Sequence, residues 1–260
     1  MASHIAAYDY CAFILLLIIT FYYLPKRISG NYRGIVLALI IFVTGAASVC
    51  DATRVRFAAK PDVSDLRFLN VNFAYYMFFS VIPLLYLVYI IAVTDTWHII
   101  RKIRKRAVMS VVPCIVFCIM LVANFFYPVV FSVGPGKELI LHFGFYLEQL
   151  LFILYNLLTV WFLGKFIDPI DHKRYRILLI PVYICVTGVA VNLFWPEQHV
   201  LCFAVALCIL MLVLISNRAE DAIDYATGMH TYKVFAEDMT TNFKSGKKMQ
   251  IILLNIVNYK

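Results

Sequence analysis

The sequence predicts an all-α polytopic membrane protein built as a seven-transmembrane-helix bundle. Of its 260 residues, 63% are hydrophobic and only 15% are charged, and the mean hydropathy is +0.84. A water-soluble domain is nearer half apolar and a quarter charged. The apolar residues also gather in blocks of about 20 residues, the length of a helix that crosses a bilayer. These observations exclude a single soluble domain.

Seven apolar blocks predict the spans, because each is long and ends at polar or charged residues. The first block is a retained anchor and not a signal peptide, since residues 1–9 contain no Lys or Arg and the basic residues follow the block. The last two blocks are separated by a short turn at residues 195–199, which contains Pro196. We place the spans at residues 8–24, 34–50, 70–93, 107–126, 143–163, 177–194 and 200–215.

Basic residues predict the orientation of these spans. Thirteen Lys and Arg lie in the connections after spans one, three, five and seven, and five lie in the alternate connections. Because Lys and Arg are retained on the cytoplasmic side, the N-terminus is expected outside and the C-terminus in the cytoplasm of a cell (inner or plasma) membrane. The net charge of +8 is therefore a topological signal, and no nucleic-acid partner is expected.

Few polar side chains fall inside the predicted spans, and Glu148 is the carboxylate placed well inside one. Ionisable groups there are costly and mark candidate functional sites. A pocket that opens outward and binds a small ligand is one interpretation. A satisfied interhelical hydrogen bond, or a position near the interface, is the other. The candidate pocket residues are Glu148, Gln149, Tyr146 and Asn156, and Asn124 and Asn192 are further polar residues that can join them.

Other functional classes have weaker support. A retinal protein needs a Schiff-base Lys in its last span, and residues 200–215 contain none; neither retinal nor haem is expected. A transporter is less favoured, because no pair of Gly- or Pro-interrupted spans indicates an inverted repeat. His4, His142 and His199 fall on the outer side, but their spacing matches no metal-binding motif, so three unrelated solvated histidines are expected. The seven cysteines are interpreted as small buried apolar side chains.

The composition changes after Ile215. Residues 216–223 are polar and predict a helical connector, residues 232–243 predict an amphipathic helix, and residues 249–256 predict a strand. This order of elements is typical of the start of a soluble α/β domain. We therefore expect three parts: a seven-span region at 1–215, the connector at 216–223, and the N-terminal fragment of another domain at 224–260.

Two motifs in the last part carry a resemblance to a known family. The segment DYATGMHTYKVF at 224–235 resembles the D-x-L-T-G-L-x-N-R-R-x-F opening of GGDEF (diguanylate cyclase) domains, and LLNIVNYK at 253–260 resembles their L-x-D-x-D-x-F-K strand and turn. The layout of the spans is similar to seven-transmembrane sensory modules that precede such domains in bacteria. The resemblance implies a membrane-bound signalling receptor, truncated here within its GGDEF domain, that regulates synthesis of cyclic di-GMP from two GTP molecules. It also implies a homodimer and an extracytoplasmic small ligand.

Site residues follow from the resemblance by position. Asn255 and Ile256 occupy the Mg²⁺-binding positions, and Asn258, Tyr259 and Lys260 occupy the triphosphate-binding turn. Asn255 replaces the metal-binding Asp, which weakens the hold on Mg²⁺, and Val257 replaces the second Asp. The GGDEF loop is not in this chain, so it contains no catalytic residues. Whether the parent is an enzyme stays open, and a non-catalytic scaffold or a nucleotide-binding sensor is the alternative.

Overall fold

The structure is a computed structural model that describes residues 6–27, 32–60, 62–93, 104–166 and 172–220. These residues form seven α-helices, one small antiparallel sheet and two 3-10 turns. The helices are α2 (Ala7–Arg27), α3 (Tyr32–Ala58), α4 (Asp65–Val93), α6 (Arg104–Ala123), α7 (Phe143–Phe166), α8 (His172–Phe194) and α9 (Leu201–Glu220). The remaining elements are β1 (Phe131–Val133), η1 (Pro135–Lys137), β2 (Leu139–Leu141) and η2 (Pro196–Gln198).

A helix is present at each of the seven predicted apolar blocks. Three segments are long and apolar enough to cross a membrane, namely Tyr32–Ala58, Asp65–Val93 and Phe143–Lys165. The apolar parts of α2, α6, α8 and α9 are shorter. A mostly helical chain of membrane-protein character is therefore supported, whereas crossing by all seven helices remains a prediction.

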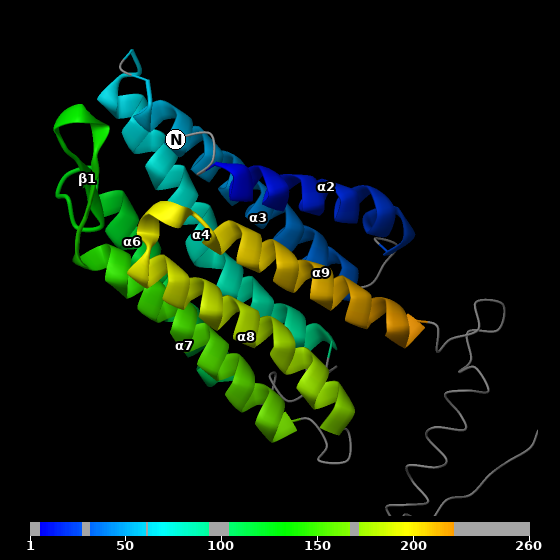
Figure 1. Cartoon of the computed structure of the whole chain (residues 1–260). Helices are drawn as coiled ribbons and strands as arrows, with labels where there is room; N and C mark the ends of the chain where they lie inside the picture. The colour runs from blue at the N-terminus through cyan, green and yellow to red at the C-terminus, as the bar shows by residue number, and fades with distance from the viewer. Residues whose placement is uncertain (1–5, 28–31, 61, 94–103, 167–171, 221–260) are drawn as a thin grey trace, which may run out of the picture.

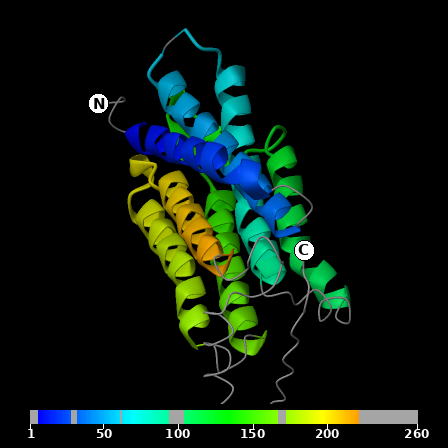
Figure 2. The ribbon, with the colours of Figure 1, turned by 90° about the vertical axis from the view of Figure 1, so that its right-hand side faces the viewer.

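Helix α4 lies at the centre of the bundle (Figures 1 and 2). It packs against α3, α6, α7 and β1, while α9 packs against α2, α3 and α8. Aromatic rings fill the layer between α4 and its neighbours: Phe79 stacks on Phe152 with ring centroids 5.2 Å apart, and Tyr76 stacks on Phe131 at the same distance. Because such rings bury large apolar areas in fixed orientations, they fix how α4 sits against α7 and the hairpin.

The connection between α6 and α7 corrects the all-α prediction, because it contains a β-hairpin. β1 and β2 pair antiparallel, with Ser132 opposite Ile140. Gly136 has φ 80°, a conformation that favours glycine. Asn124, at the end of α6, holds the hairpin: its Nδ2 donates to the Phe131 carbonyl, and its Oδ1 accepts from the backbone N–H groups of Val130 and Phe131. The hairpin is thereby fixed over one end of the bundle.

Helix α9 continues past the predicted span at 200–215 and ends at Glu220. The first five residues of the predicted connector are thus part of the same helix as the last span. The rest of the connector and the GGDEF-like fragment lie outside the described residues. The predicted Mg²⁺-position and phosphate-turn residues (Asn255, Ile256, Asn258, Tyr259 and Lys260) are therefore not described.

Candidate functional site

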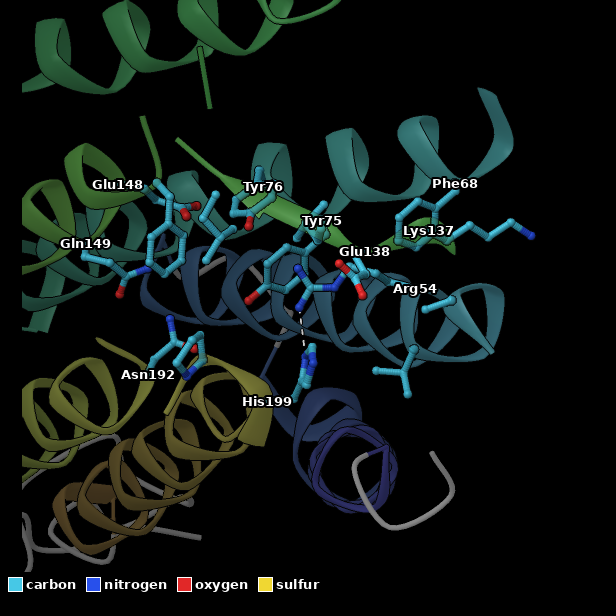
Figure 3. A pocket seen from close by; sticks show the side chains of 16 residues that line it. Arg54, Phe68, Tyr75, Tyr76, Lys137, Glu138, Glu148, Gln149, Asn192 and His199 are labelled. Carbon is cyan, nitrogen blue, oxygen red and sulfur yellow. Dashed lines mark hydrogen bonds between the residues drawn. The ribbon is translucent and has the colours of Figure 1, made fainter. Parts of the chain in front are cut away.

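A cavity of about 580 Å³ opens at the end of the bundle that carries the hairpin. Its lining comes from the last turns of α3 and α8, the first turns of α4 and α7, the hairpin, and the turn η2. Segments far apart in the sequence therefore meet around one space, and Figure 3 shows their side chains. A volume of this size suits a small organic molecule.

The α7 wall of the cavity presents acceptor oxygens. Glu148 and Gln149 are each only 2% exposed. Neither carboxylate oxygen of Glu148 has a hydrogen-bond partner among the described residues, and the same holds for Gln149 Oε1. In Figure 3 the Gln149 amide lies near Asn192, which α8 contributes, and the Glu148 carboxylate points toward Tyr76. Since buried polar groups are normally paired, these three acceptors are available to hydrogen-bond donors that enter the cavity, either water or a bound molecule.

The facing wall contains Arg54, a cation that already pairs with a carboxylate. Arg54 Nη2 lies 2.5 Å from Asp51 Oδ1, and the guanidinium lies over the Tyr75 ring, 4.5 Å from its centroid. Arg54 Nη2 also contacts His199 Nδ1 at 2.8 Å, the dashed line in Figure 3. Asp51 neutralises Arg54, and no ion pair to Glu148 is found among the described residues, so the buried Glu148 carboxyl is left without an ion-pair partner there.

The hairpin forms the outer part of the lining. Leu139 and Leu141 supply apolar surface, and Lys137 and Glu138 supply a charge of each sign. The Lys137 ammonium donates to the carbonyl of Lys60, beyond the end of α3. This contact attaches the hairpin to the α3–α4 connection. The hairpin is thus held both there and, through Asn124, at the end of α6.

The predicted pocket residues separate into two groups. Glu148 and Gln149 line the cavity, as does Asn192. Tyr146 does not line it and is 57% exposed on the outside of α7. Asn156 is buried two turns farther along α7, where its Nδ2 donates to the Phe152 carbonyl at 2.9 Å and it lines a separate, much smaller pocket. Asn124 holds the hairpin instead.

Two residues near the cavity were missed from the sequence, because the second span was predicted to end at Cys50. Helix α3 instead runs to Ala58, so Asp51 and Arg54 are buried helix residues and not loop charges. Their spacing of three residues, which places opposite charges on one helix face, was the available signal. The prediction of an unrelated solvated histidine is wrong for His199, whose Nδ1 lies 2.8 Å from Asp51 Oδ1.

Comparison of the chain with protein-family models, with curated proteins and with solved structures gives no match.

Proposed function

We propose that the chain is the sensory part of a membrane-bound signalling receptor, a seven-span bundle whose outer cavity binds a small cationic ligand. The observation that carries this proposal is the Glu148 carboxylate, which is buried, unpaired and directed into a cavity of about 580 Å³. An ionisable group kept at such a position without a partner needs a functional explanation.

The lining indicates the chemistry of the ligand. A primary ammonium or a guanidinium offers several N–H donors and a positive charge, and both match Glu148 and Gln149. The rings of Tyr75, Tyr76 and Phe145 line the same cavity and attract cations through their faces. Of the basic residues in the described lining, Arg54 already pairs with Asp51 and Lys137 donates to the Lys60 carbonyl, so an anionic ligand would meet the Glu148 carboxyl and compete for cations that are already engaged.

The path from the cavity to the cytoplasm runs through α9. His199 lines the cavity, and α9 begins two residues later and runs to Glu220. A ligand that changes the position of η2 would therefore bias α9 directly, because turn and helix are covalently continuous. The residues that follow resemble the opening of a GGDEF domain, so the proposed output is the pairing of two such domains and synthesis of cyclic di-GMP.

A non-catalytic scaffold or nucleotide-binding sensor is the second candidate, and the replacements at Asn255 and Val257 favour it. Formation of cyclic di-GMP from GTP and Mg²⁺ by a protein that continues into a complete GGDEF domain distinguishes the two. A transporter is less favoured, because few polar side chains lie along the described helices below the cavity.

Ligand binding is the direct test. We expect a size-matched panel of small amines and guanidines to contain compounds that raise the melting temperature of the purified chain in detergent, since a ligand at 100 times its Kd stabilises by about 2.7 kcal/mol. Glu148→Gln removes the charge but keeps the shape, and is expected to weaken binding by about 2 kcal/mol, roughly 30-fold in Kd.

Asp62→Asn is the matched control, because Asp62 is exposed at the same end of the bundle. It should bind as the unmodified chain does. If carboxylates or uncharged polyols stabilise the protein equally well, or if Glu148→Gln binds the amines as tightly, the proposed ligand class is wrong.

A further inference from the structure

A second cluster of polar side chains lies behind the cavity wall and joins three elements. Asp9 of α2, Asp51 of α3 and His199, which follows η2, place one ligand atom each within 4.8 Å of one another. Asp9 and Asp51 are 0% and 1% exposed. Two buried carboxylates therefore face each other at the end of the bundle, and only one of them has a counter-charge.

That counter-charge is Arg54, which contacts Asp51 and His199; no contact with Asp9 is found among the described residues. Arg54 Nη2 pairs with Asp51 Oδ1. Neither oxygen of Asp9 has a hydrogen-bond partner among the described residues. The charged groups of this space are Asp9, Asp51 and Arg54, with His199 beside them, and the buried Cys202 thiol and the Tyr75 phenol also lie close enough to interact electrostatically with Asp51. With both carboxylates ionised and His199 neutral, the cluster carries an excess of negative charge. Burying an unpaired carboxylate is strongly unfavourable, so either a proton shared by the two carboxylates or a bound cation has to balance the cluster.

The three ligand atoms of the cluster indicate which kind of cation it can bind. Two carboxylate oxygens and one imidazole nitrogen suit a divalent transition metal, whereas Ca²⁺ and Mg²⁺ prefer six or more oxygens. Zn²⁺ binds such atoms at about 2.0–2.2 Å, which places the ligand atoms of a site about 3–3.5 Å apart. His199 Nδ1 and Asp51 Oδ1 are 2.8 Å apart, and all three ligand atoms lie within 4.8 Å of one another, so small side-chain movements bring them to this spacing.

The backbone around His199 also holds its side chain in place. His199 has φ 50° and ψ 37°, in the left-handed region that non-glycine residues seldom adopt. From this position the ring contacts Asp51 and Arg54 of α3. Arg54 contacts the same Nδ1, so an ion and Arg54 compete for this atom, while the contact between Arg54 and Asp51 orients the carboxylate as outer partners of metal ligands commonly do.

We propose that Asp9, Asp51 and His199 bind one Zn²⁺ ion, or a transition metal of similar preference, which ties α2 to α3 and to the start of α9. Three protein ligands leave a coordination position for water. The proposed metal site shares His199 with the cavity lining but uses neither Glu148 nor Gln149, so metal binding and ligand binding can be tested separately.

The test uses the full chain, purified without a histidine tag and stripped with a chelator. On adding Zn²⁺, we expect about one bound ion per chain by elemental analysis after gel filtration, and a rise in melting temperature. X-ray absorption at the zinc edge should show a first shell of nitrogen and oxygen near 2.0–2.1 Å with no sulfur. This measurement needs no variant, so it stands even if a substitution prevents folding.

Asp9→Asn and His199→Gln should each weaken Zn²⁺ binding at least tenfold. The matched controls are Asp62→Asn, on the exposed connection at the same end, and His142→Gln, whose histidine contacts Ser132 at 2.8 Å in the hairpin; both should bind as the unmodified chain does. Absence of bound metal, a sulfur-containing shell, or equal binding by Asp9→Asn and His199→Gln would overturn the site in favour of a proton shared by the two carboxylates.

Discussion

At the scale of single residues, Asn124 shows how one side chain shapes the cavity. Its amide makes three hydrogen bonds to the backbone of β1 and the residue before it, and it is 6% exposed. In Asn124→Ala the buried backbone groups of Val130 and Phe131 lose their partner, which costs about 1–3 kcal/mol each time a group is left unpaired.

We therefore expect Asn124→Ala to lower the free energy of unfolding by about 2 kcal/mol or more, measured by denaturant unfolding in detergent. Asn70 is an exposed residue of α4, and Asn70→Ala should change stability by less than about 0.5 kcal/mol. Equal effects of the two substitutions would show that the hairpin does not depend on this side chain.

Of the predicted pocket residues, Glu148 and Gln149 line the cavity whereas Tyr146 and Asn156 do not, and helix geometry explains the difference. A lone carboxylate in an apolar block is conspicuous on composition alone. Tyr146 is two residues away, about 200° around the helix axis, so it faces the opposite side. Asn156 lies eight residues on, about 12 Å along the axis, which takes it beyond the cavity. Asp51 was missed because its partner His199 is 148 residues away.

At the scale of elements, the close contact between α8 and α9 depends on Gly188, which has no side chain. A Cβ added to Gly188 would lie 2.7 Å from the Cβ of Ala204, too close for two carbon atoms. The small residues let the helices approach closely, as is common between helices in membranes. α9 is the element proposed to carry the signal, so its distance from α8 matters for function as well as for stability.

Gly188→Ala should force the two helices apart and cost about 1–3 kcal/mol. Gly45→Ala, in α3, is the matched control, because a Cβ at Gly45 meets no atom within 4 Å. This substitution should stabilise the protein by up to about 1 kcal/mol, because alanine has the higher helix propensity. Thermal melting of the two variants should give shifts of opposite sign. The double variant Gly188→Ala with Ala204→Gly should recover most of the loss, and failure to recover it would place the cost elsewhere than in this contact.

The β-hairpin is an element that the sequence signals but that the all-α prediction does not include. Residues 129–133 and 139–141 are rich in β-branched and other apolar side chains and flank Gly134, Pro135 and Gly136, a typical hairpin signal. The prediction places these residues in the connection between the spans at 107–126 and 143–163 and assigns them no strand. The hairpin matters because it supplies cavity lining that no helix provides.

At the scale of the whole molecule, the apolar blocks located all seven helices, because burial in lipid or in protein demands the same long apolar runs. The ends differ where charges continue a helix, as at Asp51 and Arg54 in α3. The cavity was beyond reach from the sequence, since its lining is assembled from the ends of helices distant along the chain. The alternation of basic residues along the chain predicts which end of the bundle faces outward.

The cavity, the hairpin and the connection between α3 and α4 occupy one end of the bundle (Figure 1), and the positive-inside rule places that end outside. We therefore expect cysteine at Asp62 or Lys137 to react with a membrane-impermeant maleimide on intact cells, and cysteine at Arg101 to react only after permeabilisation. The chain with its own seven cysteines gives the background. The reverse labelling pattern would turn the cavity toward the cytoplasm, and its ligand would then have to be an intracellular molecule.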